Sequence, residues 1–593
     1  MVVRQRASRV ISAPKSVPKS ETIGDSRPKK AQSNEARRAH RHRSKSDSVV
    51  TELANFDPRR EVRFDLDFDN IPDVIRRRAR ESPAKVAVID EDVEYTYGDI
   101  WAMVRSAAGG FRTLNMKKGD RFAVLLENRL EWIVGVLGGL ALGGVLVPVS
   151  TRFVGAEVSV LLQLSGARYL LVSTDGPRDY WAGVAGHISE AESIETVIVV
   201  GEAPVDTLSW NLFLSTPVND DQLDELIDAL GPDDISDIMF TSGTTGTPKG
   251  VIARHGQSIR AHGQLTTSTG YTGDDRVMVI PPFFHSWGYK SGWLGCMLQG
   301  STSVPVRRHD ALRTMATIER HRVTALPGPP TIFLDILDSP ARGQFDLSSL
   351  RLAFPAATSV PASLVLRIRH ELGIEFVTTA YGLTETMATV TANSPTDTVE
   401  RITETVGKPI PGCEVRIVDT AVGHVLGVGE TGEIEVRGFN VTSGYWDSPE
   451  ATSDLFDGEW ARTGDIGSVD EEGYVCVTDR KKDMFIVGGF NAYPAEIEAV
   501  LTEYPGAQRV AVTGVPDERA GEVGAAFIVP RPGRIVDPAD VVTWSQSRLA
   551  NFKVPRYVYV VDDLVCNPSG KVLKSALREQ HLASMAARSG AAS

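Results

Sequence analysis

Short apolar segments alternate with amphipathic segments along most of this chain, from about residue 64 onward. The runs VAVID (86–90), RYLLVST (168–174) and TVIVVG (196–201) have the length and composition of buried strands. The segment IPDVIRRRA (71–79) carries apolar residues at helical spacing. Because parallel strands need long crossover connections, which are usually helices, this alternation predicts an α/β fold with largely parallel sheets.

One uncharged stretch of 18 residues, Trp132–Val149, is long enough to suggest a membrane span. It contains five glycines and a proline, however, which is typical of a buried helix that runs into a buried strand. We therefore expect no transmembrane segment here. Near the amino terminus no apolar stretch resembles a secretory signal.

With 593 residues the chain is too long for one hydrophobic core. Beyond about residue 406 the pattern changes to alternating strands separated by glycine turns, which predicts a small antiparallel β region. After the charged run DRKKD (479–483) a further set of strands and helices begins, including a long helix near 538–550. We expect domains at 64–481 and 482–585, with the charged run as the hinge between them.

The first 63 residues differ from the rest. The first fifty hold 13 Lys/Arg against 4 Asp/Glu, a net charge of +9, whereas the whole chain has a formal charge of −13. Few aromatic residues and many Ser, Pro, Arg and Lys predict a disordered basic extension. Charge attraction to nucleic acid or an anionic membrane and an organelle transit peptide are alternative interpretations, and composition favours a solvated extension.

The chain has four cysteines, which are widely spaced and include no C-x-x-C pair. This spacing indicates neither a zinc site nor a disulfide framework. A reducing, cytoplasmic location fits best.

The glycine-rich stretch TSGTTGTPKG (241–250) lies between two strand-like runs, SDIMF and GVIARH. A Walker loop needs a different spacing and a helix after it, so this is not a Walker loop. Glycines still allow backbone N–H groups to converge on phosphate oxygens, while hydroxyl groups and a lysine add donors and charge. The stretch is interpreted as a phosphate clamp, with a surface hairpin as the alternative.

A second glycine-rich stretch, GVGETG (427–432), has the spacing of a dinucleotide-binding loop. The run EIEVRG that follows alternates as a strand, whereas such a loop requires a helix. This stretch is therefore predicted to be a hairpin turn.

Six motifs occur in order along the chain: TSGTTGTPKG, YGLTE (381–385), RTGDIG (462–467), DRKKD, GGFNAYPAEIE (488–498) and NPSGKVLK (567–574). Together they resemble the signature of the adenylate-forming superfamily, which includes acyl-CoA synthetases, firefly luciferase and peptide-synthetase adenylation domains. The resemblance covers about residues 65–585. It implies a large adenylate-forming domain of two α/β subdomains plus a small β-barrel-like region, and a small mobile α+β C-terminal domain.

Three further segments narrow the resemblance: PPFFHSWGYKSG (281–292), LPGPPTIF (326–333) and FDLSSLR (345–351). They are similar to actinobacterial acyl-CoA ligases of the fatty-acid type, nearest to those that activate a methyl-indane-dione propanoate left by steroid degradation. The resemblance implies that a carboxylate attacks the α-phosphate of ATP to give an acyl-adenylate, and that coenzyme A then displaces AMP.

The resemblance assigns roles to individual residues. Lys571 matches the lysine that contacts the carboxylate and the bridging oxygen during adenylation, where cations must offset two anions. Lys482 matches the hinge position about which the C-terminal domain rotates. The phosphate-binding residues are Thr241, Ser242, Gly243, Thr244, Thr245, Gly246 and Lys249.

Four residues of the second motif are predicted to contact the nucleotide. Tyr381 and Gly382 line its site, and Thr384 matches a phosphate contact. Glu385 matches the acid that holds Mg²⁺, a hard cation that prefers oxygen ligands. Helix capping is the alternative role for this glutamate.

The ribose is assigned to two other residues. Asp465 matches the carboxylate that accepts hydrogen bonds from both ribose hydroxyls, and Arg480 is expected to support it. A turn aspartate and a surface ion pair are the corresponding alternatives.

The acid itself is predicted to lie near His285, for which a buried core histidine is an equal alternative. Gly489 matches the path of the pantetheine chain. One departure concerns PAATSVP (355–361), where Ala356 and Ala357 replace two glycines found in many relatives. Their methyl groups narrow the space near the substrate, so the acyl specificity of relatives does not transfer directly.

Two other functions compete with the ligase. An amino-acid or aryl-acid adenylating enzyme that serves a carrier protein would usually place an aspartate after the first aromatic residue of the FF pair, where this chain has Phe284 and His285. A non-catalytic nucleotide-binding protein with a basic tail would be expected to lose catalytic residues, and Lys571, Glu385 and Asp465 are all present. The expected partners are thus a carboxylic acid, ATP and coenzyme A, with no specific nucleic acid, for a monomer or homodimer.

Overall fold

A computed structural model of the chain describes residues 68–241, 248–357, 360–480, 483–487, 490–517, 520–546, 548–549, 551–566 and 572–590. The predicted basic extension 1–63 lies outside these ranges.

The first of two seven-stranded sheets contains the strand that leads into the glycine-rich stretch. Its order is β7 (Leu208–Ser209), β6 (Thr196–Val200), β5 (Tyr169–Ser173), β3 (Arg121–Leu125), β4 (Val145–Pro148), β8 (Ile235–Thr241) and β9 (Lys249–Arg254). All neighbouring strands are parallel except β8 and β9. The predicted, largely parallel α/β arrangement is confirmed.

The second seven-stranded sheet is built in the same way. Its order is β14 (Phe376–Val377), β13 (Leu352–Pro355), β12 (Ala325–Gly328), β10 (Arg276–Val279), β11 (Thr302–Pro305), β1 (Val86–Asp90) and β2 (Val93–Thr96). Only the edge pair β1 and β2 is antiparallel. In both sheets the carboxyl ends of the parallel strands therefore meet at one edge, which is where α/β proteins place their ligand sites.

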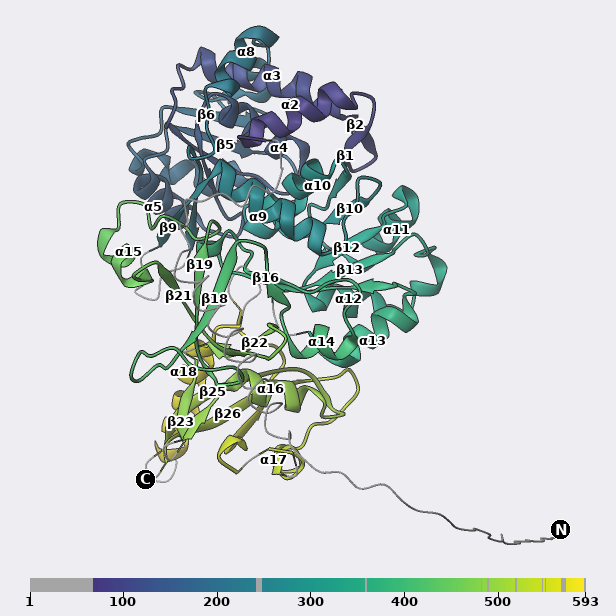
Figure 1. Cartoon of the computed structure of the whole chain (residues 1–593), viewed down its shortest axis with the longest axis vertical. Coiled ribbons are helices and arrows are strands. Elements are labelled where there is room, and N and C mark those ends of the chain that lie inside the picture. Colours follow the sequence, from purple (N-terminus) through teal and green to yellow (C-terminus); the bar gives the residue numbers. More distant parts are fainter. Residues whose placement is uncertain are drawn as a thin grey trace, which may run out of the picture. The chain divides into compact units, whose positions relative to one another are not determined.

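Some helices of this part of the chain start at residues whose side chains satisfy free backbone N–H groups. The Asn70 side chain accepts from the amide of Asp73 at the start of α2, and Thr96 and Asp99 form a reciprocal capping box at the start of α3. The helices up to the end of the second sheet are α2 (Ile71–Glu81), α3 (Tyr97–Thr113), α4 (Leu130–Ala141), α5 (Gly155–Ser165), α6 (Tyr180–Val184), α7 (Trp210–Phe213), α8 (Asp220–Asp228), α9 (His255–Ser268), α10 (Gly295–Gln299), α11 (Ala311–His321), α12 (Pro330–Leu337) and α13 (Ala362–Glu371). Among them α2, α3 and α4 pack against one another (Figure 1).

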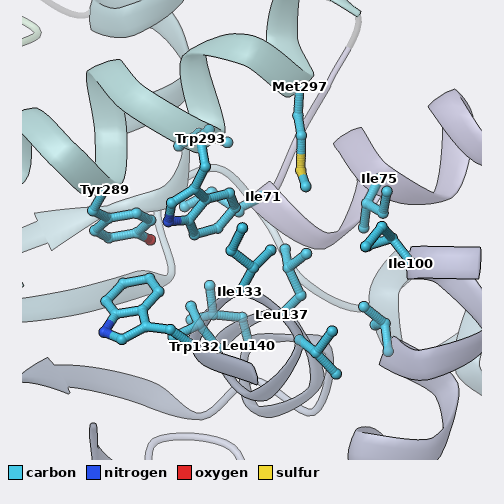
Figure 2. Close-up of a cluster of buried hydrophobic side chains, with 14 of the residues drawn as sticks. Ile71, Ile75, Ile100, Trp132, Ile133, Leu137, Leu140, Tyr289, Trp293 and Met297 are labelled. Carbon is cyan, nitrogen blue, oxygen red and sulfur yellow. The ribbon is translucent and has the colours of Figure 1, made fainter. Parts of the chain in front are cut away.

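The uncharged stretch 132–149 forms the buried helix α4 and the buried strand β4, as predicted. Within the described residues, no helix is both long and apolar enough to cross a membrane. Its apolar side chains instead join a core that also includes residues of α2, α3 and α10. Figure 2 shows Ile133, Leu137 and Leu140 of α4 at the centre of this core, with Ile71 and Met297 nearby.

An antiparallel region follows, and it begins earlier than the predicted start near residue 406, because a small sheet precedes it. A three-stranded sheet contains β15 (Ala380–Tyr381), β16 (Thr391–Ala392) and β17 (Lys408–Pro409). A five-stranded sheet contains β18 (Cys413–Val418), β19 (Gly432–Gly438), β21 (Trp460–Val469), β20 (Phe456–Asp457) and β22 (Val475–Arg480), and the helices here are α14 (Val399–Glu404) and α15 (Pro449–Leu455). The stretch GVGETG leads into β19, which confirms that it is not a dinucleotide loop.

The last part of the chain has its own sheet and its own hydrophobic clusters. The sheet contains β24 (Phe490–Ala492), β23 (Phe485–Val487), β26 (Gly521–Pro530), β25 (Ala507–Asp517) and β27 (Tyr557–Val560), with helices α16 (Pro494–Thr502), α17 (Pro538–Gln546) and α18 (Lys574–Gly590). The helix predicted near 538–550 ends earlier, at Gln546. Beyond its end, Leu549 and Phe552 pack on the same cluster as Trp544.

Candidate active site

The glycine-rich stretch is the connection between the antiparallel strands β8 and β9. Thr241 and Lys249 are paired across these strands, and the Thr241 hydroxyl donates to the Lys249 carbonyl oxygen at 3.5 Å. A strand follows the stretch, whereas a helix follows a Walker loop, so the stretch is confirmed not to be a Walker loop. It leaves the sheet at the carboxyl end of β8, where ligand sites of α/β proteins are expected.

Tyr445 connects two predicted site residues that are distant in sequence. Its hydroxyl donates to the Oε1 atom of Glu385 at 2.9 Å, and the Lys249 Nζ atom lies 5.2 Å from the centre of its ring. Burial and the neighbouring Glu385 carboxylate raise the pKa of Tyr445, so that its hydroxyl remains a donor. The backbone is held as well, since the Trp446 amide donates to the Gly250 carbonyl at 2.7 Å. No motif had indicated Tyr445.

Glu385 lies in a short 3-10 turn, η4 (Thr384–Thr386), that is tightly constrained. A Cβ atom on Gly382 would lie 2.3 Å from the backbone of Ala388, so only glycine fits there. Met387 and Ala388 both have positive φ angles, 53° and 57°, a conformation that costs energy for residues with side chains. Such strain is typical of a turn that fixes a functional group.

The Glu385 carboxylate suits a cation. The residue is half-buried, and no Lys, Arg or His of the described ranges forms an ion pair with it. A partly buried carboxylate without a protein counter-charge is an appropriate oxygen ligand for Mg²⁺. Within the described residues the N-cap residue of η4 forms no side-chain cap bond, and the Oε1 atom of Glu385 instead accepts from Tyr445.

Tyr381 and Asp465, both predicted to bind the nucleotide, are in direct contact. The Tyr381 hydroxyl donates to the Oδ2 atom of Asp465 at 2.7 Å, and the Asp465 side chain is buried within β21. In β22 the residue paired with Asp465 is Arg480, whose backbone is described and whose side chain is not. We refer to Lys249, Tyr381, Glu385, Tyr445 and Asp465 as the nucleotide side of the site.

His285 lies before η2 (Trp287–Leu294), a π-helical segment. Its side chain is exposed to solvent, which excludes the buried core histidine. Nearby protein atoms still remove part of the water around the ring, and this desolvation lowers the pKa of His285. The Trp287 amide donates to Nδ1 at 3.3 Å, so the neutral ring carries its proton on Nε2.

The other residues near His285 are apolar. The Trp287 and Phe354 rings meet edge to face, with centroids 5.9 Å apart. Ala356 is buried next to Phe354, and Ala357 has a φ of 71°, which glycine adopts without strain. The loss of glycine predicted here thus carries a conformational cost. We refer to His285, Trp287, Phe354, Ala356 and Ala357 as the acid side.

Asn128 positions the segment that carries His285 and was not predicted. Its Nδ2 atom donates to the carbonyls of Val279 and Pro281, and its Oδ1 atom accepts from the Phe283 amide at 2.7 Å. Asn128 follows the buried strand β3 closely. A polar residue at the carboxyl end of a parallel strand was the signal that could have identified it.

Several predicted residues lie outside the described ranges, and their roles stay predictions. They are Ser242, Gly243, Thr244, Thr245, Gly246, Lys482, Gly489 and Lys571. Thr384, by contrast, is described as the first residue of η4, next to Glu385.

Comparison with known proteins agrees with this geometry. Residues 75–446 match the AMP-binding enzyme family, and residues 496–571 match the C-terminal domain of AMP-binding enzymes. The chain therefore belongs to the AMP-binding enzyme family. It is an AMP-forming acyl-CoA synthetase, an acid–thiol ligase that uses ATP, Mg²⁺ and coenzyme A.

Two curated relatives carry the same name, 3-[(3aS,4S,7aS)-7a-methyl-1,5-dioxo-octahydro-1H-inden-4-yl]propanoyl:CoA ligase. The protein from Rhodococcus jostii is 42% identical over 86% of this chain and 98% of its own length. The protein from Mycobacterium tuberculosis is 41% identical over 86% of this chain and 99% of its own length. Among solved structures, an anthranilate CoA ligase in complex with anthranoyl-AMP is similar, with a TM-score of 0.79, 26% identity, and coverage of 86% of this chain and 97% of that one.

Proposed function

We propose that this synthetase activates a propanoate side chain attached to a fused-ring diketone. The observation that supports this substrate is the 42% identity to the R. jostii propanoyl:CoA ligase over nearly the whole length of that protein. The acid side, with Trp287 and Phe354 in contact, offers rigid apolar rings against which a ring system can pack.

In the first half of the reaction, the substrate carboxylate attacks the α-phosphate of ATP, the bond between the α- and β-phosphates breaks, and pyrophosphate leaves as the acyl-adenylate forms. Both reactants are anions, so the site must supply positive charge and oriented donors. In this proposal Lys571 and Lys249 supply charge, and Asp465 accepts hydrogen bonds from the ribose hydroxyls with support from Arg480. Mg²⁺ held by Glu385 would neutralise phosphate charge, and the Tyr445 hydroxyl orients the carboxylate that holds it.

In the second half, the thiol of coenzyme A displaces AMP from the acyl-adenylate. Lys571 and the thiol need the same space, so the proposal includes a rotation of residues 482–585 about Lys482 relative to residues 64–481. The separate hydrophobic clusters of the last sheet support a part that moves as a unit. Gly489 is proposed to line the path of the pantetheine chain.

A cytoplasmic location is also part of the proposal. All four cysteines are free thiols, which suits a reducing compartment.

The proposal is tested by AMP release in the presence of coenzyme A with a panel of acids. The panel contains the methyl-dioxo-octahydroindenyl propanoate, 3-cyclohexylpropanoate as a control with one plain ring, octanoate, palmitate and ferulate. We expect kcat/KM for the fused-ring diketone to exceed that for every other acid by roughly 100-fold, because acids that lack the fused rings lose apolar contacts in a pocket shaped for them. A higher kcat/KM for a fatty acid would show that the substrate is a fatty acid instead.

A further inference from the structure

A buried ion pair joins the two sides of the active site. The Lys290 Nζ atom of η2 lies 2.9 Å from the Oδ1 atom of Asp237 in β8, and the two residues are 1% and 0% exposed. The Ser236 hydroxyl donates to the other carboxylate oxygen at 2.7 Å. Within the described ranges Lys290 is the only cation paired with Asp237.

Stability alone does not explain such a pair. Both charges lose their hydration on burial, and apolar residues of similar volume often give equal or greater stability at the same place. Removal of one partner, by contrast, leaves an uncompensated buried charge. A buried pair is therefore a reason to look for a role in fixing geometry.

Lys290 lies in one segment and contacts two others, and each of the three carries or adjoins predicted site residues. Asp237 belongs to β8, which ends at Thr241 where the glycine-rich stretch begins. Lys290 itself lies in η2, which begins two residues after His285. Its Nζ atom also lies 3.7 Å from the Sδ atom of Met387, the residue that directly follows the turn of Glu385.

Two of these segments have backbones that need external support. The segment η2 is π-helical, and its Gly292 has a ψ of −106°, which breaks the helix. π-helical turns frequently occur at functional sites. Met387, as described above, has a positive φ angle. A charge contact that joins both segments to β8 limits how far either can relax.

The opposite face of η2 has only non-directional contacts. Tyr289 and Trp293 stack with ring centroids 5.2 Å apart, and Trp132 of α4 lies 5.5 Å from Tyr289 (Figure 2). Apolar contacts of this kind hold η2 against α4 and determine its register weakly. The ion pair of Lys290 and the contact of the Ser291 hydroxyl with His262 add polar restraints on the position of η2.

Neighbouring histidines do not compete with Lys290 as cations. His262 of α9 is fully buried, and its Nδ1 atom lies 3.0 Å from the Ser291 hydroxyl. Burial, together with the charge of Lys290, lowers the pKa of His262 to about 3, so the ring is neutral at pH 7.

We propose that Lys290 and Asp237 form a positioning pair for the adenylation step. The pair fixes the segment of His285 relative to the strand that enters the phosphate clamp and to the turn of Glu385, so that the carboxylate and the α-phosphate meet in reactive geometry. This inference rests on the proposed roles of His285 and Glu385. It does not depend on which acid is the substrate.

The test separates positioning from stability by removal of both charges. The double variant Lys290→Met with Asp237→Asn keeps the volumes and removes the pair, so its Tm is expected to stay near that of the wild type. We expect kcat of acid-dependent ATP–pyrophosphate exchange to fall roughly 10- to 100-fold, because displacements of about 1 Å cost that much in oriented reactions. KM for ATP and for the acid should change far less. The rate of thioester formation from preformed acyl-adenylate should also stay close to that of the wild type.

A control uses a half-buried pair at the opposite edge of the second sheet. Asp275 is 1% exposed and pairs with Arg351 at the amino ends of β10 and β13. Arg351→Met should lower Tm without changing kcat, measured at a temperature at which the variant is folded.

A double variant with wild-type kcat and a wild-type Tm would overturn the inference and leave the pair a structural element. If the double variant does not fold, Met387→Leu decides, because it removes only the sulfur contact at nearly constant volume. A fall in its exchange kcat supports positioning, and an unchanged kcat overturns it. The assay uses whichever acid the wild type activates best. Absence of exchange by the wild type with every acid would contradict the proposed function itself and is therefore distinguishable.

Discussion

The nucleotide side and the acid side are constructed by different interactions. On the nucleotide side, hydrogen bonds join functional residues of different strands, as between Tyr381 and Asp465 or between Tyr445 and Glu385. On the acid side, ring contacts and small methyl groups shape the surface, as between Trp287 and Phe354. The nucleotide side therefore depends on single polar atoms, whereas the acid side depends on volume. A change of one polar atom on the nucleotide side should lower kcat/KM for ATP strongly. A change of volume on the acid side should alter the preference between acids, with a small effect on KM for ATP.

The largest expected effect follows from Asp465→Asn. The change removes the charge that accepts the ribose hydroxyls, and hydrogen bonds to charged groups contribute about 1.5–3 kcal/mol each. We expect kcat/KM for ATP to fall by roughly 10³-fold, while KM for the acid stays unchanged. Steady-state kinetics with each substrate varied in turn measure both values. Equal losses for ATP and acid would show that the two sides are not separate.

The pH dependence of stability probes the support of the acid side, because α9 packs against η2. Burial lowers the pKa of His255 to about 4 and that of His262 to about 3, both below the ordinary value of 6.5. The unfolded state thus binds protons more readily. The contribution of the two neutral histidines to the free energy of unfolding is complete above pH 6.5 and is lost as the pH falls toward 4.

In this range each histidine should lower the free energy of unfolding by about 1.4 kcal/mol per pH unit. For His255 the total loss by pH 4 should be about 3 kcal/mol. Urea unfolding at a series of pH values measures the slope. In His255→Asn the amide oxygen can replace Nδ1 as the acceptor for the Ile71 amide, and one histidine's share of the slope should disappear. An unchanged slope would show that His255 is protonated in the folded protein.

Tyr445→Phe removes the hydroxyl that orients Glu385 and leaves the ring beside Lys249. Loss of a residue that orients a metal ligand typically weakens metal binding roughly 10- to 100-fold. We expect the Mg²⁺ concentration for half-maximal exchange to rise by this factor, with KM for the acid unchanged. The same Mg²⁺ requirement in wild type and variant would mean that Tyr445 acts on Lys249 alone.

The smallest effect is expected on the acid side. Ala357→Gly removes a methyl group and relieves a positive φ angle. We expect a shift in the ratio of kcat/KM between bulky and slender acids of roughly tenfold or less, in favour of bulky acids. KM for ATP is the internal control, and a change in it larger than the change in acid preference would contradict the comparison.

The strands and the nucleotide residues could be predicted because their signals are local. Apolar runs such as VAVID identify strands, and motif residues such as Glu385 and Asp465 stand in short, recognisable segments. Tyr445 could not be predicted, since its partner lies 60 residues away in sequence. The place of Asn128 after β3 was a signal for a site residue, but it did not indicate the partner 155 residues away. Lys290 and Asp237 were missed for a related reason, because an isolated charge in an apolar run does not indicate its partner. The end of α17 at Gln546 depended on packing of Leu549 that the periodicity did not contain.

The central claim is that Lys571 neutralises the two anions of the adenylation step and is not needed for thioester formation. Acid-dependent ATP–pyrophosphate exchange by Lys571→Ala, compared with thioester formation by the same variant from preformed acyl-adenylate, tests it most directly. We expect exchange to fall by roughly 10³-fold or more, while thioester formation stays within a few-fold of the wild type. Exchange at the wild-type rate in this variant would contradict this role of Lys571.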